Sequence, residues 1–200
     1  HDVIVGFSCK SRICCSSCSG RTMASTAAHL TDFVLPRVGW RQWTLSFPFE
    51  MCGLLAYRAE VLKAVVQRAV GRILTSRKAQ CEPAEGEKIE CGAVAAVQRF
   101  NQALGLNVHL HILLPDGVWR VSDDKVEFQR LPAPTSVDLA EICHDLSLSV
   151  QRYLVTNKLL RGEDDKSPPP DPQLRCMELA LSAGERVAAD KVGKKTKDDD

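Results

Sequence analysis

Apolar positions repeat with helical spacing in two long stretches of the chain. Between positions 61 and 74 they recur every three or four residues, with lysines and arginines between them, so they fall on one face of an α-helix. After Pro134, Thr135 or Ser136 can cap a second long helix. Its predicted buried face comprises Leu139, Ile142, Cys143, Leu146, Val150, Tyr153 and Leu154. A smaller helix is predicted over residues 22–35, before Pro36.

Shorter apolar runs predict strands. Positions 41–47 alternate between apolar and polar residues, as in a strand with one buried face. Residues 91–100 and 108–114 are apolar runs joined by a polar connection, and we expect them to be neighbours in one sheet. Residues 115–117 predict a turn and residues 118–131 a hairpin. This order predicts an α+β fold, with helices packed on one face of an antiparallel sheet.

Composition narrows the class of protein without identifying it. A hydrophobic fraction of 44% and a charged fraction of 26% are typical of a globular domain. No apolar stretch approaches the roughly 18 residues that a membrane helix needs, so we expect no membrane partner. The net charge of +1 neither indicates nor excludes nucleic-acid binding. Because the sequence opens on His1 and closes on a polar run, we expect it to be a piece of a longer protein.

Cysteines crowd the first 18 residues. Cys15 and Cys18 have the spacing of half a tetrahedral thiolate zinc site. Few apolar side chains surround them, so we expect a bound metal to stabilise the fold of this segment. Cys9, Cys14 or His1 could complete a local set of ligands. The five remaining cysteines are scattered and are expected to be buried or incidental thiols.

A His-x-His pair lies in the second apolar run. On a strand, His109 and His111 project to the same face, while Val108, Leu110 and Ile112 point into the core. Two imidazoles at this spacing can bind one divalent ion. The alternative is a pair of histidines on a solvated sheet face, because the motif by itself is weak.

Several motifs, in order along residues 1–160, resemble the two-tyrosine HUH transposases of rolling-circle insertion sequences. The opening resembles the N-terminal zinc-binding domain of those proteins, and the later segments resemble their catalytic domain. The matching segments are Phe7-Ser8-Cys9-Lys10, Cys15-Ser16-Ser17-Cys18, Arg21-Thr22-Met23-Ala24, Arg41 to Pro48, Cys91 to Phe100, Ala103 to His111 and Leu114 to Val118.

The resemblance implies a chemistry for the histidine pair. In HUH enzymes a His-hydrophobe-His pair holds a divalent ion, Mg²⁺ or Mn²⁺, against a phosphate of single-stranded DNA. A tyrosine attacks that phosphate and becomes joined to the 5′ end. His109 and His111 match the metal-binding pair. Gln98 is the candidate third ligand, and an ordinary sheet-edge glutamine is its alternative.

The nucleophile is where this chain departs from the family. The resemblance places a tyrosine on a helix well after the histidines, but the chain has two tyrosines. Tyr57 precedes the histidines, and Tyr153 falls on the apolar face of the second long helix. We therefore expect a chain that binds metal and DNA without cleaving.

The resemblance also suggests an organisation for the whole chain. Residues 1–35 would be the C-terminal part of a zinc-binding domain, whose other cysteine pair would precede His1. Residues 36–161 would be an incomplete HUH-endonuclease-like domain, and residues 162–200 a linker and tail. Zinc would bind at Cys9, Cys15 and Cys18, and DNA at Lys10, Arg12, Arg21 and Arg41. The implied location is the bacterial cytoplasm, at the nucleoid.

Two other functions remain open at this point. One is a nucleic-acid-binding module without catalysis, in which Trp40 or Trp43 would supply stacking and Arg41 and Lys10 the charge. The other is an unrelated metal-dependent hydrolase. It would need an acid or base near the histidines, and Asp116 is the only nearby acidic candidate.

Overall fold

The computed structural model describes residues 16–160, with side chains from residue 19 onward. The chain divides into two compact units, His1–Val38 and Gly39–Asp200. The described part of the first unit is one helix, α1 (Ser16–His29), which continues as the π-helical turn η1 (Leu30–Val34). The predicted helix is therefore present but begins six residues earlier than residue 22.

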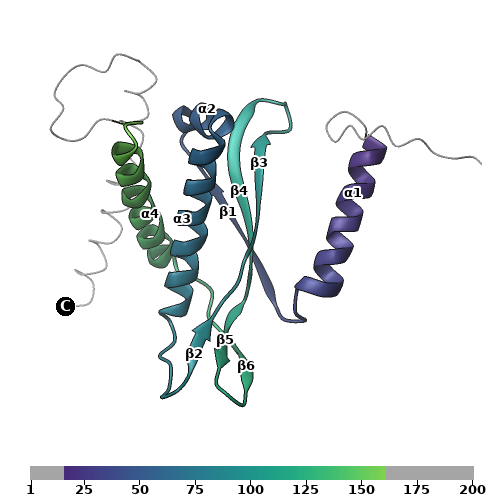
Figure 1. Cartoon of the computed structure of the whole chain (residues 1–200), viewed down its shortest axis with the longest axis vertical. Helices are drawn as coiled ribbons and strands as arrows, with labels where there is room; N and C mark the ends of the chain where they lie inside the picture. Colours follow the sequence, from purple (N-terminus) through teal and green to yellow (C-terminus); the bar gives the residue numbers. More distant parts are fainter. Residues whose placement is uncertain (1–15, 161–200) are drawn as a thin grey trace, which may run out of the picture. The chain divides into compact units, whose positions relative to one another are not determined.

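The second unit mixes helices and strands in its described part (Figure 1). They are β1 (Trp40–Ser46), α2 (Phe49–Tyr57), α3 (Ala59–Lys78), β2 (Lys88–Glu90), β3 (Val94–Phe100), β4 (Leu106–Pro115), β5 (Gly117–Val121), β6 (Val126–Arg130) and α4 (Ser136–Thr156). All strand pairs are antiparallel. The predicted α+β class is confirmed.

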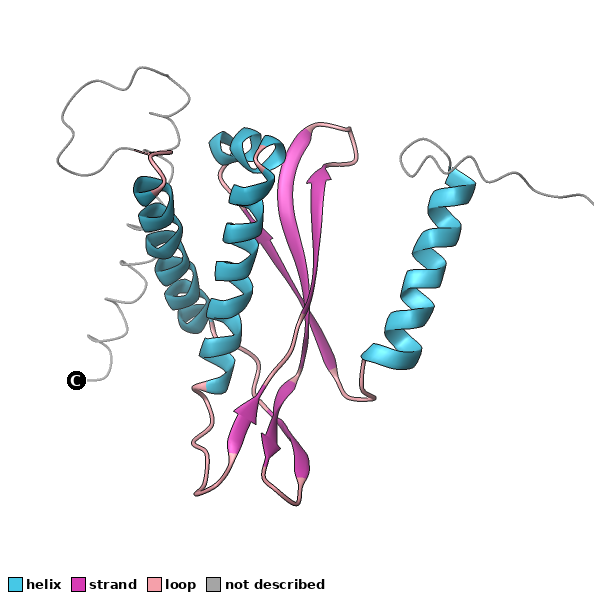
Figure 2. Cartoon of the chain, viewed as in Figure 1, coloured by secondary structure: helices cyan, strands magenta, loops and turns pink. Residues whose placement is uncertain are grey.

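The strands form two sheets, where the sequence predicted one. Their strand orders are β1-β4-β3 and β2-β5-β6 (Figure 2). The predicted turn at residues 115–117 is wrong: the chain bends at Asp116 and passes directly from β4 into β5. Pro115 still pairs with Trp40, and the Asp116 amide donates to the Gly39 carbonyl at 2.7 Å, so the ladder holds this segment extended.

The main core joins the helices to one face of the first sheet. The apolar stripe of α3 packs with the buried residues of α2, α4 and β4. Burying such side chains contributes about 1.5–3 kcal/mol each, which makes this cluster the principal source of stability. The fully enclosed strand residues are Val108, Leu110, Ile112 and Leu114, all at 0–1% exposure.

Thr135 caps α4, as the sequence allowed. Its side chain accepts from the Asp138 amide at 3.2 Å, and the Asp138 carboxylate accepts from the Thr135 amide at 2.7 Å. The predicted buried face of α4 was too wide. Leu139 is 40% exposed and Cys143 is exposed, because the buried stripe is narrower and lies over Ile142, Leu146, Val150 and Leu154.

Two short elements escaped prediction. Helix α2 has apolar residues around its whole circumference and Gly53 at its centre, so it lacks the one-sided pattern that identifies a helix. Strand β2 has three residues within a stretch that reads as a loop. In residues 16–160, we find no helix that is long and apolar enough to cross a membrane.

Candidate functional site

The two histidines lie side by side on the central strand of the first sheet. Along β4, buried residues alternate with half-buried ones, so His109 and His111 project away from the helices. Their ring centroids are 4.9 Å apart, in an edge-on arrangement. The structure therefore gives the predicted geometry: two imidazoles on the sheet face opposite the core.

Small and polar side chains surround the pair. His109 lies opposite Ser46 on β1 and Gln98 on β3, while His111 lies opposite Thr44 and Ala96. These four neighbours are exposed. Since none of them is bulky, a ligand can approach both rings from the open side of the sheet.

One hydrogen bond sets the tautomer of His109. Its Nδ1 lies 2.8 Å from the Asn107 carbonyl oxygen. A carbonyl only accepts, so Nδ1 carries the proton and the Nε2 lone pair is left for a ligand. Such a bond also fixes the orientation of the ring, as in protein metal sites.

His111 is held on both sides by glutamines. Gln98 Nε2 donates to the Phe100 carbonyl at 3.1 Å, which turns its Oε1 toward His111 Nε2 at 3.2 Å. The other ring nitrogen, Nδ1, lies 2.8 Å from Gln42 Nε2. In this network Gln42 donates to Nδ1, and Nε2 donates to Gln98.

A metal ion fits the pair after two local changes, a shift of the His111 proton to Nδ1 and a turn of the Gln42 amide group. His111 would carry its proton on Nδ1 and donate to the Gln42 amide oxygen, which frees Nε2 beside Gln98 Oε1. Two imidazole nitrogens and an amide oxygen are then available, all of them neutral. Within residues 16–160 there is no cluster of three or more histidine, cysteine or acidic residues that could hold a metal. Water or a bound phosphate can supply further oxygen ligands.

Neither tyrosine lies on the histidine face. Tyr153 packs against the main core from α4, beneath the Arg68 guanidinium, whose central carbon is 4.3 Å from the ring centroid. Tyr57 ends α2 and is 86% exposed. Both helices pack against the core face of β4, whereas the imidazoles are on its opposite face.

Asp116 and Arg41 are paired with each other away from the histidines. Arg41 Nε and Nη2 donate to Asp116 Oδ1 at 3.0 and 2.8 Å. Asp116 is five residues beyond His111, about 16 Å along an extended chain. The Arg41 hydrogen bonds lower the pKa of the Asp116 carboxyl, so it stays ionised. The acid that a hydrolase would need is therefore not placed at the histidines.

The remaining predicted site residues belong to the first unit or lie outside the described residues. Cys9, Lys10, Arg12 and Cys15 lie outside the described residues, and the side chain of Cys18 in α1 is not described. Arg21 is exposed on α1, in the first unit. The zinc site and these DNA contacts stay predictions.

The sequence reasoning missed Gln42 and Asn107. Both residues alternate with the apolar positions of their strands, and this alternation was the sequence signal that placed them on the polar face. The β1–β4 register that brings Gln42 to His111 could not be read from either segment alone.

Residues 92–172 match the family model described as "Putative transposase". The match covers β3 and β4, and therefore Gln98, His109 and His111. It supports a transposition-related role for this part of the chain. Neither a curated protein nor a solved structure matches the chain.

Proposed function

We propose that this chain is the metal- and single-strand-binding part of a two-tyrosine HUH transposase, and that it binds DNA without cutting it. His109 and His111 hold one divalent ion, Mg²⁺ or Mn²⁺, and Gln98 Oε1 is the third protein ligand. The observation that carries the proposal is the paired imidazoles on an open sheet face, within the segment that matches a transposase family.

The ligand set suits a phosphate partner. When bound, the ion would supply positive charge to a phosphodiester and polarise its oxygens. Neutral protein ligands leave that charge undiminished, so a DNA phosphate would complete the coordination. The protein's part is to fix the two rings: Asn107 orients His109, while Gln42 and Gln98 orient His111.

The lack of cleavage follows from where the tyrosines lie. An attacking phenol must reach the phosphate held at the histidines. Tyr153 is packed in the helix layer, and Tyr57 ends α2 in the same layer. The proposed zinc-binding segment at Cys9, Cys15 and Cys18 would contribute DNA contacts through Lys10, Arg12 and Arg21.

Calorimetric titration of Mn²⁺ tests the metal site. We expect saturable binding by the unchanged chain and its loss in the His109→Ala/His111→Ala double variant. Adding a single-stranded oligonucleotide should tighten Mn²⁺ binding, because a phosphate would take a free coordination position. His29→Ala is the matched control, since it removes an exposed imidazole from the other unit.

Two results would contradict the proposal. Equal Mn²⁺ binding in the unchanged chain and the double variant would place the ion elsewhere. Oligonucleotide binding that is insensitive to a chelator and to both histidines would favour a nucleic-acid-binding module without a metal site. A strong fall in that binding at raised salt would then identify phosphate contacts as its basis.

A further inference from the structure

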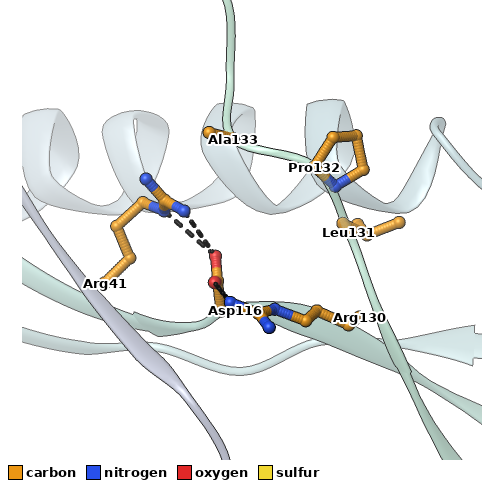
Figure 3. Close-up of a pocket in the computed structure, with 6 residues that line it drawn as sticks. All are labelled: Arg41, Asp116, Arg130, Leu131, Pro132 and Ala133. Atoms are coloured by element: carbon orange, nitrogen blue, oxygen red, sulfur yellow. Dashed lines mark hydrogen bonds and ion pairs between the residues drawn. The ribbon is translucent and has the colours of Figure 1, made fainter.

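A separate pocket of about 440 Å³ lies where β1, the β4–β5 bend and the segment after β6 meet. Its charged side is formed by Arg41, Asp116 and Arg130 (Figure 3). Its apolar side is the stretch Leu131-Pro132-Ala133, which leads into α4. The charged groups come from β1, from the bend between β4 and β5, and from the end of β6.

Asp116 organises the charged side. Its amide donates to Gly39 and its carbonyl accepts from the Leu131 amide at 3.0 Å, so the backbone is fixed on both sides. Its side chain is 10% exposed, and it holds the Arg41 guanidinium through two nitrogens. Arg41 therefore presents a guanidinium whose position is set before any ligand arrives.

Arg130 is held far more loosely. Its side chain is 81% exposed, and its contact with Asp116 Oδ2 is 3.5 Å long. A guanidinium in this state can turn toward an incoming anion at little cost. Arginine is suited to that task because its planar fork matches the oxygens of a phosphate.

A buried third arginine adds to the positive charge. Arg77 of α3 is 3% exposed and donates to the Pro132 carbonyl at 3.1 Å, directly behind the apolar wall. Burial lowers its pKa, and the charge of Arg41 lowers it further, while Asp116 and Asp138 raise it. Two guanidiniums and one carboxylate line the pocket, and the Arg77 guanidinium lies behind its wall, so the pocket has an excess of positive charge.

We propose that this pocket binds a phosphate together with its attached sugar, as one unit of a single-stranded DNA chain. Arg41 and Arg130 hold the phosphate, and the wall at Pro132 and Ala133 contacts the sugar. The ring of Pro132 and its bonded carbonyl make that wall rigid. The choice of a DNA strand as the source of the phosphate rests on the proposed function.

The site is distinct from the histidine pair. Arg41 is on the helix-facing side of β1, opposite buried Leu114, whereas Thr44 is opposite His111 on the open side. The two positions on β1 are three residues apart, about 10 Å along the strand. Since β1 is an edge of its sheet, a DNA chain could pass over that edge from one site to the other.

Fluorescence anisotropy with a labelled oligothymidylate tests the pocket, using the full chain with a chelator and no metal. Arg130→Gln should weaken binding by about tenfold, the effect of one charge-assisted hydrogen bond. The slope of log affinity against log salt should fall by about 0.7 for one lost phosphate contact. Arg152→Gln removes an equal charge from an exposed site on α4, and should change affinity less than twofold.

Competition with inorganic phosphate and thymidine monophosphate separates the sources of the ligand. If either compound competes with the oligonucleotide in the unchanged chain but not in Arg130→Gln, and Arg130→Gln also binds the oligonucleotide more weakly, the pocket is assigned to a DNA strand. Arg130-dependent binding of the free compounds with unchanged oligonucleotide affinity would assign the pocket to a free phosphate. Equal losses in the Arg130 and Arg152 variants would overturn the pocket altogether. Because the assay contains a chelator and no metal, failure of the proposed metal site would not affect this result.

Discussion

The guanidinium of Arg68 lies over the ring of Tyr153, with 4.3 Å between its central carbon and the ring centroid. Arg68 Nη1 also donates to the Ala64 carbonyl at 3.0 Å, one turn back along α3. Tyr153 is therefore held between α3 and α4 by packing and by a cation–π contact worth about 0.5–1 kcal/mol. This contact gives the tyrosine a structural role in the helix layer.

Replacing Tyr153 by phenylalanine should leave DNA binding unchanged. The ring, its packing and its contact with Arg68 all remain, so the free energy of unfolding should change by less than about 0.5 kcal/mol. Neither the unchanged chain nor Tyr153→Phe should attach covalently to single-stranded DNA with Mn²⁺, as read on a denaturing gel. A covalent adduct that forms with the unchanged chain and disappears in Tyr153→Phe would reverse the assignment.

Local periodicity accounts for the parts of the fold that the sequence predicted. The α3 stripe, the alternation along β1 and β4, and the Thr135 cap each depend on residues within a few positions of one another. The bend at Asp116 does not: its direction is set by pairing with Gly39 and Leu131, which lie far away in the sequence. The division of the strands into two sheets also depends on pairing between distant segments, so the sequence predicted one sheet where the structure has two.

The candidate site divides in the same way. His109 and His111 share a face by strand parity alone, so their geometry could be predicted. The Gln42 contact requires the β1–β4 register, and the pairing of Arg41 with Asp116 requires β1 to lie beside the end of β4. Such non-local arrangements leave no periodic signal in the sequence.

Gln42 should act as a positioning residue for the proposed metal site. Gln42→Leu removes the partner of His111 Nδ1, and loss of such partners typically weakens metal binding by about 10–100-fold. Gln42→Glu should restore binding, since a carboxylate accepts strongly from Nδ1–H. Calorimetric Mn²⁺ titration measures both variants.

Thr44→Val is the control for Gln42, because Thr44 is opposite His111 on the same strand and valine keeps its shape. The affinity of Thr44→Val for Mn²⁺ should be within about twofold of that of the unchanged chain, which is the variation expected for a substitution without a direct contact. Equal losses in Gln42→Leu and Thr44→Val would mean that the whole sheet face, and not the hydrogen bond, governs affinity.

Gly117 is required by the close approach of β6. A Cβ at this position would lie 2.6 Å from the Phe128 ring and closer still to the Gln129 carbonyl oxygen. Gly117→Ala should therefore lower the free energy of unfolding by about 1–3 kcal/mol, as overpacking does. Urea denaturation followed by circular dichroism measures the change.

Gly71 provides the opposite case on α3, where a Cβ would meet nothing within 4 Å. Gly71→Ala should raise stability by about 0.5–1 kcal/mol, because alanine loses less backbone entropy in a helix. If both alanine variants changed stability alike, the close contact between β5 and β6 would not be the cause.

The ion pair between Asp116 and Arg41 should make stability depend on pH in the acid range. The Arg41 hydrogen bonds lower the pKa of Asp116 in the folded protein, so the unfolded chain takes up a proton at a higher pH. The stabilisation is complete above the unfolded pKa, about 3.9, and is lost as pH falls through the folded value. Asp116→Asn should cost about 1–3 kcal/mol at pH 7, and that difference should shrink below pH 4.

Urea midpoints measured between pH 3 and pH 7 test this for Asp116→Asn and for Asp123→Asn. Asp123 is exposed in the β5–β6 turn, so its replacement should change the free energy of unfolding by less than about 0.5 kcal/mol at pH 7. A difference between the unchanged chain and Asp116→Asn that stayed constant down to pH 3 would contradict the ionic origin of the effect. The carboxylate would then stabilise the bend by packing alone, and Arg41 would not be pre-positioned by charge.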